Sequence, residues 1–156
     1  MLTLSVIFRS NRNSPQRAIT ADNTPGNCWA FDGSQGQLVI QLSHKVFVRY
    51  ITIEHIPRNL SPSGQIRSAP REISISALSG PNDKVSSVFI HKLRSMFQIG
   101  YHLAKIEFDI SGPSIQMFPI LHDMNFMVQH VMVKFNSNWG EEYTCVYRVR
   151  VHGDIE

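Results

Sequence analysis

From Gln37 onward the sequence alternates between apolar and polar residues, and this two-residue period restricts the possible folds more than any other feature. Side chains along a β-strand point to opposite faces in turn, so such alternation predicts strands with one buried face. Segments of this kind cover residues 37–42, 46–55, 71–78, 104–110, 114–120, 128–135 and 143–152. Turn-forming Gly, Pro, Ser and Asn separate them. We therefore predict an all-β fold, an antiparallel β-sandwich of the jelly-roll type.

The chain divides into an N-terminal arm and a single domain. A length of 156 residues with 42% hydrophobic residues suits one domain with a substantial core. Residues 1–24 are rich in Asn, Arg and Ser and predict a poorly ordered arm, which leaves 25–156 as the domain. Within that domain, the polar link at 43–45 is expected to separate the first two strands.

Two segments depart from the strand pattern. Residues 85–102 space their apolar side chains roughly as a helical stripe. This segment could be an amphipathic helix, a buried connector or a helix at a membrane surface. Residues 56–71 form a long loop with three prolines between two predicted strands. Long loops inside compact domains are usually binding elements or disordered.

Composition argues against several functional classes. The net charge is only +3, and the Lys and Arg residues are scattered, so nucleic-acid binding is poorly supported. No apolar run approaches the roughly 18 residues that a membrane span needs, and the opening residues make a poor signal peptide. Glu54–His55 could in principle do acid–base work, but no set of nucleophile, base and orienting residue has a recognisable spacing. We therefore expect a protein that is not an enzyme.

The two cysteines, Cys28 and Cys145, lie far apart along the chain, each close to a tryptophan. They lack the CxxC or HxxxH spacing of a zinc site, and no metal site is expected. A position in the middle of a strand suits Cys145 poorly as a reactive thiol. A disulfide fits better, and it would stabilise the fold by roughly 4–5 kcal/mol and imply an oxidising compartment. Two reduced cysteines in the core are the alternative.

The strand predicted at 143–152 places Tyr143, Cys145 and Tyr147 on one face. Two tyrosines on either side of a cystine form a flat surface edged by hydroxyl groups. Such a surface suits either packing within the domain or binding of a peptide end.

Several long motifs, in order along the chain, resemble the SUN domain, the C-terminal module of inner-nuclear-membrane proteins. They are "PGNCWAF" (25–31), "GSQGQLVIQLS" (33–43), "ITIEHIPRNLSPSGQIRSAPRE" (51–72), "IQMFPI" (115–120) and "SNWGEEYTCVYRVRVHG" (137–153). The motif "SPSG…SAP" is similar to the matching sequence of the testis-type members, which act in spermatogenesis.

The resemblance implies a non-enzymatic β-sandwich that binds the C-terminal tail of KASH proteins. It also implies a homotrimer that works in the perinuclear space of the nuclear envelope, in the LINC complex that links nucleus and cytoskeleton. A carbohydrate-binding β-sandwich remains the alternative, because the jelly-roll pattern and the Tyr and Trp content also fit one.

The resemblance extends to single residues. Cys28 and Cys145 match the intramolecular disulfide of the family. The positions that match the pocket for the KASH terminus are His55, Ser68, Ala69, Tyr143 and Tyr147. Those that match the loop for a monovalent cation, K⁺ or Na⁺, are Thr20, Asp22 and Asn27. The first set is chemically reasonable, because Ser and Tyr hydroxyls can donate hydrogen bonds to a peptide carboxylate.

Two parts of the chain depart from the family pattern. Residues 85–102 look like an insertion between two strands that the family joins more briefly. The opening of the chain departs as well. Family members carry a short helix and a β-hairpin lid before the position that matches residue 25, and "MLTLSVIFRSNRNS" matches neither. The lid clamps the KASH strand through main-chain hydrogen bonds. From this difference we expect the chain alone to bind a KASH peptide weakly or not at all.

Overall fold

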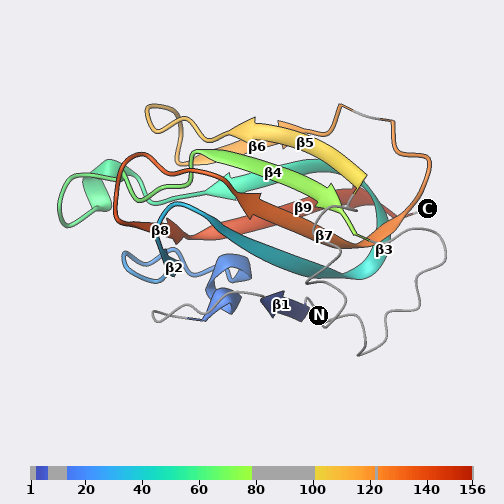
Figure 1. Ribbon diagram of the computed structural model, residues 1–156, viewed down its shortest axis with the longest axis horizontal. Coiled ribbons are helices and arrows are strands. Elements are labelled where there is room, and N and C mark those ends of the chain that lie inside the picture. The colour runs from blue at the N-terminus through green and yellow to red at the C-terminus, as the bar shows by residue number, and fades with distance from the viewer. Residues whose placement is uncertain (1–2, 7–13, 79–100, 122, 156) are drawn as a thin grey trace.

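The computed structural model describes residues 3–6, 14–78, 101–121 and 123–155. It is an antiparallel β-sandwich, which confirms the predicted fold class (Figure 1). The strands are β1 (Thr3–Val6), β2 (Trp29–Asp32), β3 (Gly36–Glu54), β4 (Glu72–Ala77), β5 (Tyr101–Glu107), β6 (Ile115–Pro119), β7 (Val128–Phe135), β8 (Tyr143–Val146) and β9 (Arg148–Asp154). Two short 3₁₀ helices, η1 (Pro15–Ile19) and η2 (Arg58–Leu60), complete the described elements.

The long strand β3 belongs to both layers of the sandwich. Its first half pairs with β1 and β7, and its second half pairs with β6 and β9. The remaining strands extend the first layer in the order β7-β4-β5, while β2 and β8 form a separate two-stranded sheet. The expected break at 43–45 is wrong: β3 continues through these exposed polar residues, and the β3–β7 register shifts between Gln41 and Val46. A bulge of this kind bends a strand without ending it.

The core lies between the two layers and follows the predicted alternation. In β4 every second residue is buried, namely Ile73, Ile75 and Ala77. The aromatic centre of the core is formed by Trp29 and Phe31 of β2, whose ring centroids lie 4.7 Å apart, together with Phe135 of β7. Because β2 supplies two of these rings, the small β2–β8 sheet is packed firmly onto the main sandwich.

The N-terminal segment is more ordered than the sequence suggested. The poorly ordered arm expected over residues 1–24 is wrong for residues 14–24, because η1 buries Ala18 completely in the core. The side chain of Ser14 caps this helix by accepting a hydrogen bond from the backbone of Gln16. One small apolar residue is enough to dock so short a helix, and it leaves no periodic signal in the sequence.

Two other segments differ from their predicted boundaries. The strand expected at 143–152 is divided at Tyr147 into β8, which pairs with β2, and β9, which pairs with β3. Most of the helical insertion expected at 85–102 lies outside the described residues. Its last two residues, Tyr101 and His102, belong to β5 instead.

A disulfide joins Cys28 to Cys145, with the two Cα atoms 5.5 Å apart and 117 positions between them in the sequence. This confirms the predicted pairing. The bond lies at the start of the β2–β8 sheet, where Ala30 pairs directly with Cys145. It therefore fixes the turn before β2 against the strand that closes the fold.

We expect loss of this bond to lower the free energy of unfolding by up to about 5 kcal/mol, because it closes a long loop of the unfolded chain. Urea unfolding of the oxidised and the reduced protein would measure the difference. A variant carrying both Cys28→Ser and Cys145→Ser is the control and should not respond to reductant. Equal stability of the oxidised and reduced wild-type protein would contradict this expectation.

Candidate functional site

A surface hollow of about 460 Å³ lies against the disulfide, and we call it the tyrosine hollow. Three parts of the chain line it: the turn before β2, the loop from His55 to Ser68, and strand β8 with Tyr147 after it. None of its lining residues is Asp, Glu, Lys or Arg. The hollow is therefore polar but carries no formal charge of its own.

Backbone hydrogen bonds position the loop beside β8. The amide of Cys145 donates to the carbonyl of Ser68 at 2.9 Å, and the amide of Trp139 donates to the carbonyl of Arg67 at 3.1 Å. Ser68 is thus held next to the cystine, and its side chain lines the hollow. Within the described part of the chain, its hydroxyl has no hydrogen-bond partner, so it can donate to a ligand.

Tyr147 lies deep in the hollow with only 3% of its surface exposed. Its hydroxyl accepts a hydrogen bond from the backbone N–H of Gly26 at 3.0 Å. Burial raises the pKa of Tyr147, so the hydroxyl keeps its proton at neutral pH. Because the Gly26 N–H uses the oxygen only as an acceptor, that proton can be donated to a ligand.

His55 is also buried, with 4% of its surface exposed, and its ring packs edge-on against Tyr147 at a centroid distance of 4.8 Å. The ring Nδ1 lies 3.0 Å from the carbonyl oxygen of Ile56. Since a carbonyl only accepts, Nδ1 carries the proton and Nε2 is an acceptor. Nε2 is buried and has no hydrogen-bond partner among the described residues. Burial lowers the pKa of His55 to about 4, so the ring is neutral at physiological pH.

Four of the five residues predicted for this site are brought together in the tyrosine hollow: His55, Ser68, Tyr143 and Tyr147. Tyr143 is 37% exposed, which is far more than the buried Tyr147. Ala69 is the exception, because it is completely buried in the main core and is not among the residues that line the hollow. Its amide donates to the carbonyl of Ile66, which closes the turn that presents Ser68.

Sequence reasoning missed the apolar part of the site. Ile56 and Ile66 are both buried, and they pack with the cystine and Tyr147 in one cluster. Ile56 directly follows the strand predicted at 46–55 and could have been interpreted as the last inward-facing residue of that strand. Ile66 was detectable as the one branched aliphatic residue in the polar stretch "SPSGQIRS".

The predicted cation loop is organised by hydrogen bonds among its own side chains. The carboxylate of Asp22 accepts from the amide and hydroxyl of Thr24 and from the side-chain amide of Asn27 at 2.6 Å. The hydroxyl of Thr20 donates to the carbonyl of Arg17. The hydrogen bonds that Asp22 accepts, first of all the one from the Thr24 hydroxyl, lower the pKa of its carboxyl group. The side chains of Asp22, Thr24 and Asn27 thus order this loop, and a monovalent cation at Asn27 and the backbone around Thr20 and Asp22 stays a prediction.

Glu54 and His55 are neighbours in sequence but face different environments. The Glu54 side chain is 3% exposed, and one of its carboxylate oxygens lies 2.6 Å from a guanidinium nitrogen of Arg150. The other oxygen accepts a hydrogen bond from the side-chain amide of Asn23 at 2.9 Å. Adjacent strand residues point to opposite faces, so His55 lies on the side of the tyrosine hollow. The two side chains form no acid–base pair, and Glu54 instead ties the N-terminal segment to β9.

Comparison with known proteins gives a consistent assignment. A model of the family "Sad1 / UNC-like C-terminal" matches residues 8–155. Human SUN domain-containing protein 1 is 41% identical over 145 residues, which is 90% of this chain and 16% of that protein. Human SUN domain-containing protein 5 is 38% identical over 148 residues, 93% of this chain and 35% of that protein. The chain therefore spans only a minor part of these relatives.

Solved structures resemble the fold at much lower sequence identity. A family 32 carbohydrate-binding module from Streptococcus pneumoniae EndoD has a TM-score of 0.71 and 8% identity, and the match covers 98% of this chain and 96% of the module. At this identity the likeness concerns the sandwich alone. In the described ranges, no helix has the length and hydropathy of a membrane-spanning segment.

The state of His55 predicts a specific pH dependence of stability. The folded protein keeps the ring neutral down to a pKa of about 4, whereas the unfolded chain takes up a proton below about 6.5. Stability present above pH 6.5 is therefore lost as the pH falls from 6.5 to about 4, by about 3 kcal/mol from this group alone. Urea unfolding of the wild type and of His55→Gln across this range would measure it.

His55→Gln should show a shallower loss of stability with falling pH than the wild type. The matched control is His44→Gln, which changes an exposed histidine and should keep the wild-type dependence. An NMR titration of the His55 ring with a midpoint near 6.5 would contradict the assigned state.

Proposed function

Because the chain belongs to the Sad1/UNC-like C-terminal family, the SUN domains, we propose that it is a protein-binding module whose tyrosine hollow receives the C-terminal tail of a KASH protein. In this function it contributes to a LINC complex between nucleus and cytoskeleton. The chemistry needed is recognition of a peptide end, and no bond is made or broken.

One observation carries the proposal: hydroxyl groups from the loop, from the start of β8 and from Tyr147 just after β8 converge on one uncharged hollow beside the disulfide. A terminal carboxylate accepts hydrogen bonds, and Ser68, Tyr143 and Tyr147 can donate them. The acceptor Nε2 of His55 complements these donors, because the last residue of a peptide also carries an N–H group. A peptide end presents both kinds of group within one residue, which matches the mixed character of the hollow.

The proposed location and assembly rest on the family. A disulfide persists in oxidising compartments, and the perinuclear space of the nuclear envelope is such a place. Homotrimer formation and the identity of the KASH partner are parts of the same proposal. The proposal needs no nucleic acid, and no mechanistic step in it needs a cation.

The carbohydrate-binding alternative is less well supported by the site. Sugar sites commonly use exposed aromatic faces, and the tyrosine hollow offers only Tyr143 in that form, because Tyr147 is buried. The likeness to the carbohydrate-binding module is one of fold, at 8% identity. A binding module for peptide ends therefore accounts for more of the observed arrangement.

Because the opening of the chain does not match the family's lid, we expect a synthetic peptide with the C-terminal sequence of a KASH protein to bind only weakly. Its C-terminally amidated form should bind at least about tenfold more weakly still. The reason is that charge-assisted hydrogen bonds to a carboxylate contribute about 1.5–3 kcal/mol each. Ser68→Ala and Tyr143→Phe should each lower the affinity for the peptide with a free carboxylate by a similar factor. Isothermal titration calorimetry would provide all four affinities.

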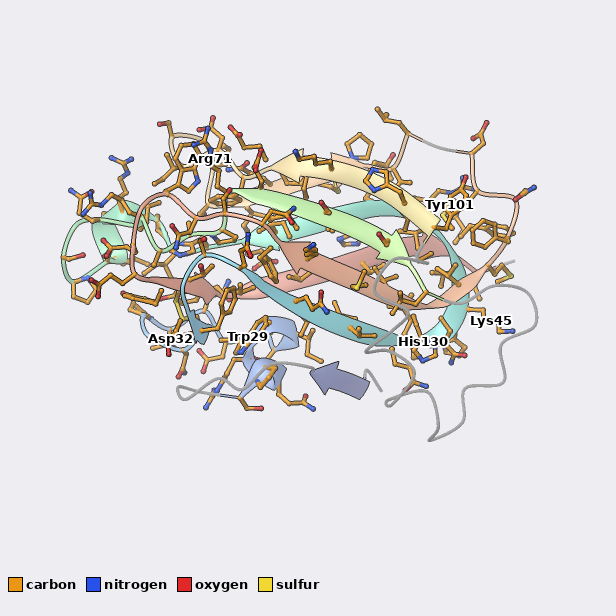
Figure 2. The ribbon with its side chains drawn as sticks, in the orientation of Figure 1. Trp29, Asp32, Lys45, Arg71, Tyr101 and His130 are labelled. Atoms are coloured by element: carbon orange, nitrogen blue, oxygen red, sulfur yellow. A yellow bond between two sulfur atoms is a disulfide. The ribbon has the colours of Figure 1, made fainter. Side chains whose placement is uncertain are left out.

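The matched control is Tyr101→Phe, which removes the same hydroxyl group at the opposite end of the sandwich (Figure 2). It should leave the affinity unchanged. Equal binding of the acid and amidated peptides would refute the carboxylate assignment, even if both bind well.

A further inference from the structure

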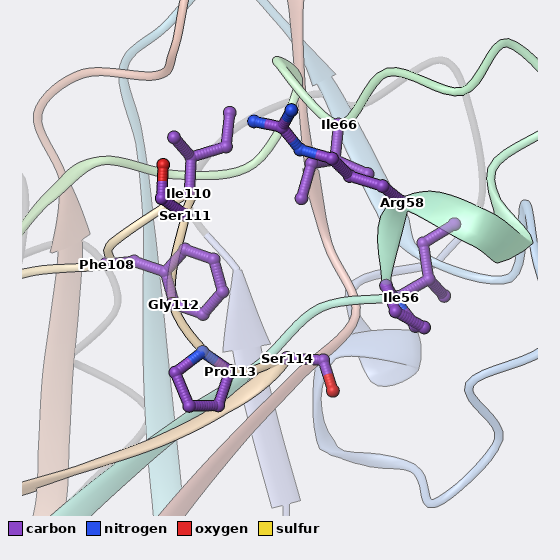
Figure 3. A pocket seen from close by; sticks show the side chains of 10 residues that line it. Ile56, Arg58, Ile66, Phe108, Ile110, Ser111, Gly112, Pro113 and Ser114 are labelled. Carbon is purple, nitrogen blue, oxygen red and sulfur yellow. The ribbon is translucent and has the colours of Figure 1, made fainter.

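A second hollow, of about 330 Å³, adjoins the tyrosine hollow, and we call it the Phe108 hollow (Figure 3). Its floor is formed by buried Ile56, Ile66 and Phe108, with half-buried Ile110 beside them. Ile56 and Ile66 line both hollows. The His55 ring also stands between them, 4.8 Å from Tyr147 and 6.3 Å from Phe108 by centroid distance. The two hollows are therefore adjoining parts of one surface, with Ile56 and Ile66 shared between them.

The Phe108 hollow is preformed, because hydrogen bonds hold the loop from Phe108 to Ser114 on both sides. The amide of Phe108 donates to the carbonyl of Arg71 at 2.9 Å, and the indole N–H of Trp139 donates to the carbonyl of Phe108 at 3.1 Å. At the other end of the loop, the amide of His55 donates to the carbonyl of Ser114 at 2.9 Å. A ligand would thus meet an existing apolar surface, and little ordering entropy would oppose binding.

The rim of this hollow carries a positive charge. Arg58 of η2 is exposed, and Figure 3 shows its side chain extending across the hollow toward Ile110. In the parts of the chain that the structure describes, no carboxylate lies within ion-pair distance of Arg58. The other arginines of those parts each have such a partner: Arg17, Arg49, Arg67, Arg71, Arg148 and Arg150. An apolar floor under the Arg58 guanidinium suits an aliphatic side chain next to an acidic group.

We propose that the Phe108 hollow is a second subsite for the same tail, which takes an aliphatic side chain and an adjacent carboxylate upstream of the terminus. This inference rests on the proposed function, because it places the terminal carboxylate in the tyrosine hollow. The occupant follows from continuity and charge. A chain leaving the first hollow past Ile56 and Ile66 next meets an apolar floor and a guanidinium that has no carboxylate partner among the described residues. The tail is therefore read in two places, first by its end and then by its upstream composition.

The test uses two kinds of synthetic peptide, both with a free C-terminal carboxylate. The first is a tripeptide with the terminal residues of a KASH tail, which reaches only the tyrosine hollow. The second kind is extended upstream with Gly and Ser, and a Leu-Glu pair is placed at successive positions along the extension. Because an extended chain advances about 3.3 Å per residue, this series samples the unknown distance between the subsites. Fluorescence polarisation with the disulfide-bonded protein would give the affinities.

At one spacing, the Leu-Glu peptide should bind about tenfold more tightly than the tripeptide, as burial of an aliphatic side chain predicts. Arg58→Glu should lower the affinity for that peptide by about fivefold or more and leave the affinity for the tripeptide unchanged. The reason is that a pair of exposed opposite charges contributes up to about a factor of five in affinity, and like charges repel. Ile110→Ser should reduce the gain from Leu in the same way. The matched control is Lys45→Glu, which makes the same change of charge at the other end of the sandwich (Figure 2).

The outcomes separate the two proposals. If the tripeptide binds and no position of the Leu-Glu pair strengthens binding, the second subsite is refuted and the first is retained. The second subsite is also refuted if a gain appears but survives both Arg58→Glu and Ile110→Ser. If the tripeptide itself fails to bind, the proposed function falls and takes this inference with it.

Discussion

The bond between Cys28 and Cys145 is the constraint on which the candidate site depends. It fixes the turn before β2 against β8, and only this arrangement brings the Gly26 amide to the hydroxyl of Tyr147. The same strand, β8, holds the long loop through the hydrogen bond from Cys145 to Ser68. Three segments far apart in sequence thus meet at one cross-link. The bond closes a long loop and so lowers the entropy of the unfolded chain. This stabilises the junction although it lies at the edge of the sandwich.

The electrostatics of the fold separate buried charge from the recognition surface. Glu54 forms a buried ion pair with Arg150 on one side of β3, where Asn23 supplies a further hydrogen bond. On the other side, burial keeps His55 and Tyr147 neutral. An uncharged hollow suits a transient ligand, because a buried unpaired charge would be strongly destabilising in the unbound protein. Hydroxyl donors avoid that penalty and still stabilise a carboxylate when it arrives.

The sequence predicts the sheet well and the site in part, for identifiable physical reasons. The predicted segment 128–135 coincides with β7, although four consecutive residues of that strand, 130–133, are buried and only its ends alternate. The two-residue period predicts a false break inside β3 at 43–45, because exposed polar residues can stay extended through a bulge. It misses the division at Tyr147, because no Gly or Pro marks the change of partner strand. The apolar floor of Ile56 and Ile66 depends on how a loop folds back, which alternation does not report.

The sandwich alone does not determine what is bound, since a carbohydrate-binding module shares it at 8% identity. The two hollows are built largely by the loops 55–71 and 108–114, and the turn before β2 and strand β8 complete the tyrosine hollow. His55 links them physically: its ring contacts Tyr147 in one hollow and Phe108 in the other, and its amide holds Ser114. The Ile56 carbonyl fixes the ring proton on Nδ1. Nε2 can therefore only accept a hydrogen bond. One buried, neutral histidine thus lines the tyrosine hollow and packs against the aromatic floor of the Phe108 hollow, and it joins the loops that build the two.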